Sequence, residues 1–285
     1  MFNKKTILVS GFSRGGTNIV WNIMQSHPLV CAPEHETGAI FRYPEHLKFC
    51  HFIRIADKLG FLETHVSRHI IDYQLYRYKM KNLQKPENKY KYEDKVYTRR
   101  EVADSVLCLK SVDEDVFCTD LLLEVYPDIY IVFLVRNGYA IAEGHARRGI
   151  SIKKSAENYV SIGRYMKSME KKYNRCIIIK FEDILTDLFT MSSNLFKFAE
   201  LEPQKLEKIR LKSKKVVKSS DVHEVSFGTK DKKYWFTADQ ISQILDPEIN
   251  TKQISNLTSE QIKEFNSIAE HQISEFGYKK IAFHT

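Results

Sequence analysis

The sequence predicts an α/β fold: a mostly parallel sheet of about five strands with helices on both faces, a helical insertion and a helical C-terminal region. Two observations favour it. Short apolar runs alternate with helical patterns, which is the order expected of a parallel sheet covered by crossover helices. The chain has 285 residues, of which 43% are hydrophobic, enough for one substantial core. We therefore expect a single domain over residues 1–285.

Five runs have the compact and often β-branched composition of buried strands. They are residues 6–10, 29–32, 106–110, 130–135 and 176–181. Helical periodicity covers residues 16–26, 119–126 and 156–173. His27-Pro28 ends the first helix, since proline cannot continue one. The last third of the chain has no comparable strands and is predicted to be helical, notably over residues 258–276 before Gly277.

Residues 40–103 differ in character from the rest of the chain. They are rich in aromatic residues and cations, and residues 82–94 are polar. We expect a helical insertion within the domain that serves as a lid or as a wall of the acceptor site. The alternative is a helical subdomain whose lysines extend their charged ends into water.

Charge and cysteine content limit the classes of function. The formal net charge of +8 suits an anionic partner, either nucleic acid or a multiply charged nucleotide. There is no apolar run of transmembrane length and no signal-peptide pattern. The five cysteines are scattered without metal-ligand spacing, which indicates free thiols in a reducing compartment. These features predict a cytoplasmic protein without a bound metal.

A glycine-rich turn joins the first predicted strand to the first helix. Such a turn directs backbone N–H groups, and the positive end of the helix, at an anion. Gly11 and Gly16 have the spacing of an NTPase phosphate-binding loop (P-loop). However, Thr17 stands where the NTPase has its lysine, and Asn18 stands where it has the metal-binding hydroxyl. Because the loop's cation is Arg14, this P-loop-type fold is expected to bind a phosphate with a further anionic group and no metal.

Residues 11–18, followed by His27-Pro28, resemble the 5′-phosphosulfate loop of sulfotransferases that use 3′-phosphoadenosine 5′-phosphosulfate (PAPS). The departures from that loop are Ser13 in place of proline and Gly15 in place of serine or threonine. The resemblance implies a nucleotide-binding loop made of Arg14, Gly15, Gly16, Thr17 and Asn18.

The same resemblance requires a site for the 3′-phosphate after a later strand. Arg136 follows the apolar run 130–135, and its guanidinium matches phosphate geometry. The family places a serine eight residues later, where this chain has Gly144. This loss of a donor would weaken phosphate binding or shift it to His145 or a backbone N–H group. Arg148 matches a second phosphate-binding arginine of the tyrosylprotein branch.

Weaker similarities extend over most of the chain. Pro127-Asp128 looks like the family's entry to the strand, and Lys180-Phe181-Glu182-Asp183-Ile184 looks like the family's segment that reads Arg/Lys, Tyr/Phe, Glu, Asp and Leu. Phe276-Gly277-Tyr278 is similar to its ending. Three residues resemble the late loop that closes over the nucleotide, namely Lys232, Lys233 and Trp235.

Sulfuryl transfer depends mainly on alignment and charge stabilisation. The resemblance implies that Arg14 stabilises the leaving 5′-phosphate. The histidine base of the cytosolic branch is absent, because Val112 follows Lys110 and Ser111. Lys110 and Ser111 remain candidates for contact with the substrate.

The carbohydrate and tyrosylprotein branches place a glutamate base just past the second strand. Counted from Arg14, that position falls on His35, with Glu34 and Glu36 on either side. A neutral histidine beside carboxylates is a sensible base near pH 7. The choice among the three stays open.

The predicted function is transfer of a sulfuryl group from PAPS to a hydroxyl or amine acceptor. The acceptor is unidentified: a carbohydrate, a lipid, a small alcohol or a tyrosine. One alternative is a P-loop nucleoside or small-molecule kinase, against which the missing lysine argues. Others are a nucleic-acid-binding protein, suggested by the basic-aromatic residues 73–95, and a catalytically inactive protein of the same fold.

Overall fold

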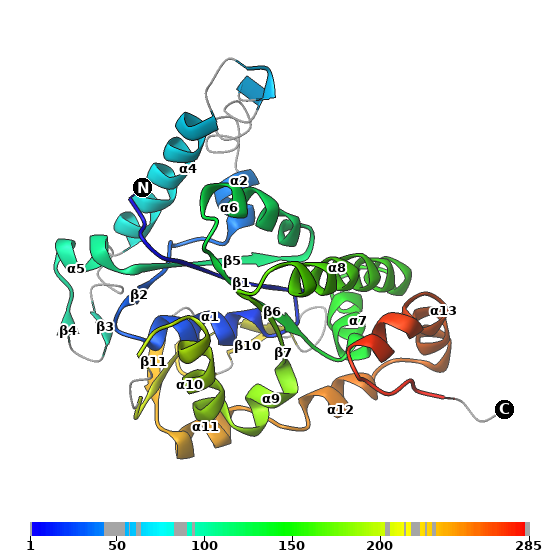
Figure 1. Cartoon of the computed structure of the whole chain (residues 1–285). Helices are drawn as coiled ribbons and strands as arrows, with labels where there is room; N and C mark the ends of the chain where they lie inside the picture. Colours follow the sequence, from blue (N-terminus) through cyan, green and yellow to red (C-terminus); the bar gives the residue numbers. More distant parts are fainter. Residues whose placement is uncertain are drawn as a thin grey trace.

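A five-stranded parallel sheet forms the centre of the molecule (Figure 1). The computed structural model describes residues 2–42, 55–56, 58–60, 64–82, 90–92, 95–202, 206–213, 215–217, 223–225, 227–229 and 232–282. The sheet has the order β2-β5-β1-β6-β7. Its strands are β1 (Thr6–Gly11), β2 (Val30–Cys31), β5 (Val106–Val112), β6 (Tyr130–Val135) and β7 (Cys176–Lys180). All five predicted strands are confirmed within a few residues.

Helices cover both faces of the sheet, as predicted. Successive residues of β1 point to opposite faces: Leu8 is buried in one core cluster and Val9 in the other. The Leu8 face packs under α6 (Thr119–Val125), α8 (Ile152–Lys172) and α13 (Ser259–Glu275). The Val9 face packs against α1 (Thr17–Ser26) and α10 (Leu188–Phe198). Periodicity predicted α1, α6 and α13 to within one residue, and α8 begins four residues earlier than predicted, at Ile152.

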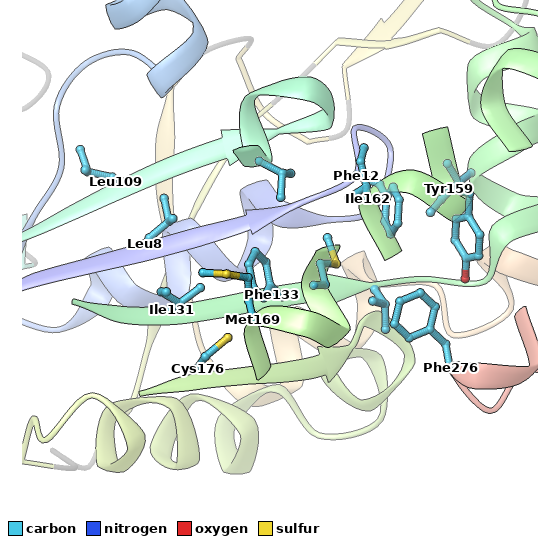
Figure 2. Packing of buried hydrophobic residues seen from close by; sticks show 14 of the residues in the cluster. Leu8, Phe12, Leu109, Ile131, Phe133, Tyr159, Ile162, Met169, Cys176 and Phe276 are labelled. Atoms are coloured by element: carbon cyan, nitrogen blue, oxygen red, sulfur yellow. The ribbon is translucent and has the colours of Figure 1, made fainter. Parts of the chain in front are cut away.

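The end of β1 is anchored to α8 by aromatic packing. Phe12 stacks on Tyr159 with ring centroids 4.8 Å apart, and Phe276 meets the same tyrosine edge-on at 5.8 Å. Figure 2 shows these rings lying together beside the central strands. Aromatic pairs at these separations stabilise beyond their buried area. The loop that follows β1 therefore starts from a fixed point.

Part of the predicted insertion belongs to the main core. It contains α2 (Thr37–Arg42), α4 (Thr64–Asn82), the strands β3 (Tyr90–Tyr92) and β4 (Lys95–Val96), and α5 (Arg99–Asp104). Ile71 and Leu75 of α4 are buried in the core cluster on the Leu8 face. Asp72 accepts hydrogen bonds from the Tyr126 hydroxyl at 2.7 Å and the Asn3 backbone at 3.2 Å. Much of the polar stretch 82–94 lies outside the described residues.

The C-terminal region is helical from residue 238 onward, as predicted, but the described residues between 209 and 236 include strands that the sequence did not predict. Two antiparallel strand pairs lie there, β8 (Ile209–Lys212) with β11 (Lys233–Phe236), and β9 (Lys215–Val217) with β10 (His223–Val225). Ile209 and Leu211 of β8 are buried against the Val9 face of the sheet. Their two-residue period is obscured in the sequence by the surrounding lysines and arginines. Helices α11 (Ala238–Ile244) and α12 (Ile249–Ile254) lead from there to α13.

The remaining elements follow the carboxyl ends of β5, β6 and β7. They are a short 3₁₀ segment at Asp113–Cys118, α7 (Gly138–Ala146) and α9 (Phe181–Thr186). Within the described residues, no helix is both long and apolar enough to cross a membrane. Cys31, Cys108 and Cys176 are buried and Cys118 is half-buried; Cys50 lies outside the described residues.

Candidate functional site

The loop between β1 and α1 has the tight backbone that its glycines predict. The Gly15 N–H donates to the Phe12 carbonyl at 3.1 Å, which closes the turn and removes this N–H from the expected anion donors. Gly16 has a left-handed φ of 92°, and a Cβ there would lie 2.3 Å from the Phe181 ring. Only glycine fits this position. The first N–H groups of α1, including that of Thr17, lie at the end of this loop and have no partner within the helix.

Arg14 is the loop's cation and also has a left-handed backbone, with φ 61°. Its carbonyl accepts a hydrogen bond from Arg136 Nη1 at 2.7 Å. Its side chain lies against Gly144 of α7. Burial lowers the pKa of Arg14, and the positive charges of Arg148 and Arg147 lower it further. The structure thus brings together four residues that the sequence assigned to two separate phosphate sites: Arg14, Arg136, Gly144 and Arg148.

Ser13 is held on both its backbone and its side chain. Its N–H donates to Asp113 Oδ1 at 2.8 Å, and its hydroxyl lies 2.7 Å from His145 Nε2. The other ring nitrogen of His145 lies 2.8 Å from the Ser155 hydroxyl. Burial lowers the pKa of His145, against the opposing effect of Asp113. Because both ring nitrogens are engaged, His145 supports the loop in this structure and presents no spare donor to a phosphate.

Arg136 is buried and makes its hydrogen bonds within the protein. Nε donates to Asn250 Oδ1 at 2.7 Å, and Nη2 donates to Gln253 Oε1. The guanidinium also lies 4.5 Å from the centre of the Phe181 ring. Burial lowers the pKa of Arg136 to about 10, with Glu182 acting in the opposite direction. Three of its N–H groups therefore hold the loop and α12 in place.

Two of the weaker sequence similarities meet at Glu182. Its carboxylate accepts a hydrogen bond from the Tyr278 hydroxyl at 2.7 Å and from the Asn137 backbone at 3.2 Å. Asn250 donates to the same carboxylate. Burial, followed by the charge of Glu182, raises the pKa of Tyr278. This network joins the C-terminal segment to the strand end that carries Arg136.

A second group of polar residues lies beside α1. Lys110 Nζ is 2.5 Å from Glu36 Oε1 and 2.7 Å from Asn18 Oδ1. It also lies 5.2 Å from the centre of the Trp21 ring. The Lys110 side chain is 1% exposed, whereas that of Glu36 is 40% exposed. Burial lowers the pKa of Lys110, and the charge of Glu36 opposes this shift. The result is a buried cation whose carboxylate partner faces solvent.

The other candidates past the second strand are placed differently. His35 is 53% exposed, and its Nε2 lies 3.7 Å from Glu34 Oε2. Among the described ion pairs, the carboxylate that contacts Lys110 is that of Glu36. Ser111 is buried and shares a 2.6 Å hydrogen bond with the Thr37 hydroxyl, which fixes the start of α2.

The late basic segment lies on the β8–β11 pair. Lys233 pairs with Lys212 and Trp235 with Arg210, while Lys232 is exposed. The charge of Lys212 lowers the pKa of Lys110. The β8–β11 pair therefore adds positive charge on the Lys110 side of the loop.

Sequence reasoning missed the residues that hold the arginines. Gln253 bonds to Arg136 and also donates to Glu143 Oε2 at 3.1 Å. Asn256 donates to the other oxygen of Glu143 at 3.2 Å. Amide side chains in or just after a short helix carry no sequence signal for such roles. Among the described residues, no group of three or more His, Cys, Asp or Glu side chains is arranged to hold a metal ion.

Comparisons with known proteins agree with this architecture. Residues 6–205 match the family described as "Sulfotransferase family". The fold is similar to a sulfotransferase domain from the Synechococcus PCC 7002 olefin synthase, with a TM-score of 0.52 and 15% identity over 98% of this chain and 97% of that one. It is also similar to a sulfotransferase domain from the curacin biosynthetic pathway, with a TM-score of 0.50 and 14% identity over 97% and 99% of the two chains. No curated protein matches the sequence.

Proposed function

The chain belongs to the sulfotransferase family, and on this premise we propose that it transfers a sulfuryl group from PAPS to a hydroxyl or amine acceptor, releasing adenosine 3′,5′-bisphosphate. One observation carries the choice of donor. The phosphate loop has Arg14 as its cation and Thr17 where an NTPase has lysine, and arginines surround it. A donor with two phosphate groups and no required metal suits this arrangement.

The donor would be bound at the start of α1. The N–H groups of Gly16, Thr17 and Asn18 would receive the 5′-phosphate, because the first N–H groups of a helix lack partners within it. Lys110, bonded to Asn18 at 2.7 Å, supplies a positive charge next to them. The sequence predicted a role for Arg14 at the leaving phosphate. Because its side chain lies toward α7, this proposal assigns the 5′-phosphate to the helix N–H groups and Lys110 instead.

Glu36 is the general base in this proposal. Of the three candidates, it is the one that contacts Lys110, at 2.5 Å, and it is open to solvent. Its carboxylate would take the proton of the acceptor as the acceptor atom forms a bond to sulfur. The bond between sulfur and the 5′-phosphate oxygen breaks, and its electron pair stays on that phosphate. Lys110 and the helix N–H groups stabilise the charge that develops there.

Incubation with radiolabelled PAPS and fractionated cell extract tests the proposal. We expect label to appear in one acceptor class, identified by mass spectrometry, and to disappear with Glu36→Gln protein. Binding of adenosine 3′,5′-bisphosphate without any labelled product would instead favour an inactive protein of this fold.

A further inference from the structure

Gly144 stands where the family resemblance calls for a serine, and the structure shows what occupies the space. A Cβ at Gly144 would lie 3.1 Å from both Cβ and Cγ of Arg14, and 3.2 Å from its Nε. Contacts this short are tighter than ordinary van der Waals packing. The side chain of Arg14 therefore runs along α7 across the position that a serine side chain would take.

Arg14 is not free to move away from this position. Its left-handed backbone, with φ 61°, is fixed by the 2.7 Å hydrogen bond from Arg136 to its carbonyl. Arg136 is in turn held by Asn250 and Gln253 of α12. The Cβ of Arg14, the atom nearest to Gly144 together with Cγ, is thereby set by the backbone.

The charges around Arg14 are unbalanced. Arg147 and Arg148 both lower its pKa, and Glu143 is the carboxylate that opposes them. Glu143 is already tied to Arg147, with contacts of 2.7 Å and 2.9 Å. Within the described part of the chain, Nε of Arg14 is buried and has no hydrogen-bond partner. A buried donor without a partner is costly, so this atom favours an anionic ligand.

Arg148 completes the arrangement. It is exposed, and its backbone N–H donates to the His145 carbonyl at 2.8 Å in the turn that ends α7. Two guanidinium groups together carry the double positive charge that matches the double negative charge of a phosphate monoester.

We propose that Arg14, together with Arg148, holds the 3′-phosphate of the donor, and that the glycine at position 144 gives Arg14 the room to do so. Arg136 keeps its bonds to α12 and to the loop. The inference rests on the proposed function, because it assumes a nucleotide with a 3′-phosphate. It assigns to an arginine of the first loop the contact that the missing serine would have made.

Calorimetric titration with adenosine 3′,5′-bisphosphate and with adenosine 5′-monophosphate tests the assignment. The Kd for the monophosphate divided by the Kd for the bisphosphate measures recognition of the 3′-phosphate alone. We expect Arg14→Ala and Arg148→Ala each to reduce this ratio at least about tenfold, the scale of a charge-assisted hydrogen bond, with monophosphate binding little changed. Arg164→Ala is the matched control, since Arg164 is exposed on α8 and should leave the ratio unchanged. Arg148 is a surface side chain, so its variant answers the question even if Arg14→Ala folds poorly.

Gly144→Ser is the most informative variant, because the two explanations of Gly144 predict opposite changes in this ratio. If Gly144 were only the loss of a phosphate donor, serine would raise the ratio in the natural protein. If Gly144 makes room for Arg14, the serine lowers the ratio in the natural protein and raises it in an Arg14→Gly background, where the Cβ and Cγ that crowd position 144 are both gone. A serine that raises the ratio in the natural protein would overturn the proposal, as would equal loss of both nucleotides in Arg14→Ala. If the natural protein binds both nucleotides with one affinity, the 3′-phosphate site itself does not exist. In that case the proposed donor falls, which is a different result from a failed assignment of Arg14.

Discussion

Glu36→Gln separates the loss of turnover from the loss of stability more clearly than any other single change at the site. The substitution keeps the size and one acceptor oxygen of the side chain but removes its charge and its ability to take a proton. As the base, Glu36 should contribute about 10²–10⁴-fold to turnover. We expect a loss of this size in transfer of label from PAPS. His35→Ala and Glu34→Gln, on the same loop, should retain turnover within about threefold, because Glu36 is the carboxylate that the described ion pairs place on Lys110.

The same change has a predictable cost in stability. Breaking a fully buried ion pair costs about 3–5 kcal/mol. Here Lys110 is 1% exposed but Glu36 is 40% exposed, so solvent screening reduces this to about 1–2 kcal/mol. A chain of this size should lose about 2–8 °C in Tm.

A double variant shows whether the two effects are distinct. Glu36→Gln with Lys110→Met removes the unpaired cation and should regain most of the lost Tm, since apolar replacement of a buried pair is often neutral. Turnover should stay lost. The reasoning is refuted if Glu36→Gln retains turnover within about threefold, or if His35→Ala loses as much as Glu36→Gln.

The remaining predictions concern the loop and its supports. Gly16→Ala should lower the free energy of unfolding by about 3 kcal/mol or more, because of its φ of 92° and the 2.3 Å separation between an added Cβ and the Phe181 ring. Gly149→Ala, with φ 77° and open space around it, should lower it by about 1 kcal/mol. Thermal melts of the two variants compare these losses. Arg136→Met leaves three acceptors without their donor and should lower stability by about 3 kcal/mol or more in urea unfolding. The folded-state pKa of His145 lies below its ordinary value of 6.5, so the unfolded chain binds the extra proton first as pH falls. Stability should therefore decrease as pH drops below about 6.5, and this slope should become shallower in His145→Gln.

The sheet was predictable from the sequence because each buried strand is a short apolar run bounded by turn residues. Residues 130–135 coincide with β6, and the run after the N-terminus coincides with β1 apart from Gly11. Strand β8 was not predictable in the same way. Its apolar positions, Ile209 and Leu211, alternate with Arg210, which is itself buried, so its composition is that of a solvated segment.

The candidate site was predictable in part. Arg14 and Arg136 were identified from their places after β1 and β6, and the parallel sheet brings those strand ends together because both strands run the same way. The direction of the Arg14 side chain was not predictable, since it depends on a contact with Gly144 that no spacing rule encodes. The choice of Glu36 among three neighbours was likewise not available from the sequence. It depends on which side chain reaches Lys110, a residue more than seventy positions away in the chain.

The donor is the central claim, and a nucleotide titration tests it most directly. Calorimetry in the presence of EDTA should give a Kd for adenosine 3′,5′-bisphosphate at least about tenfold tighter than the Kd for ATP, with no change on adding magnesium. Tighter binding of ATP that requires magnesium would contradict the account, and would indicate that the loop serves a kinase despite having Thr17 in place of lysine.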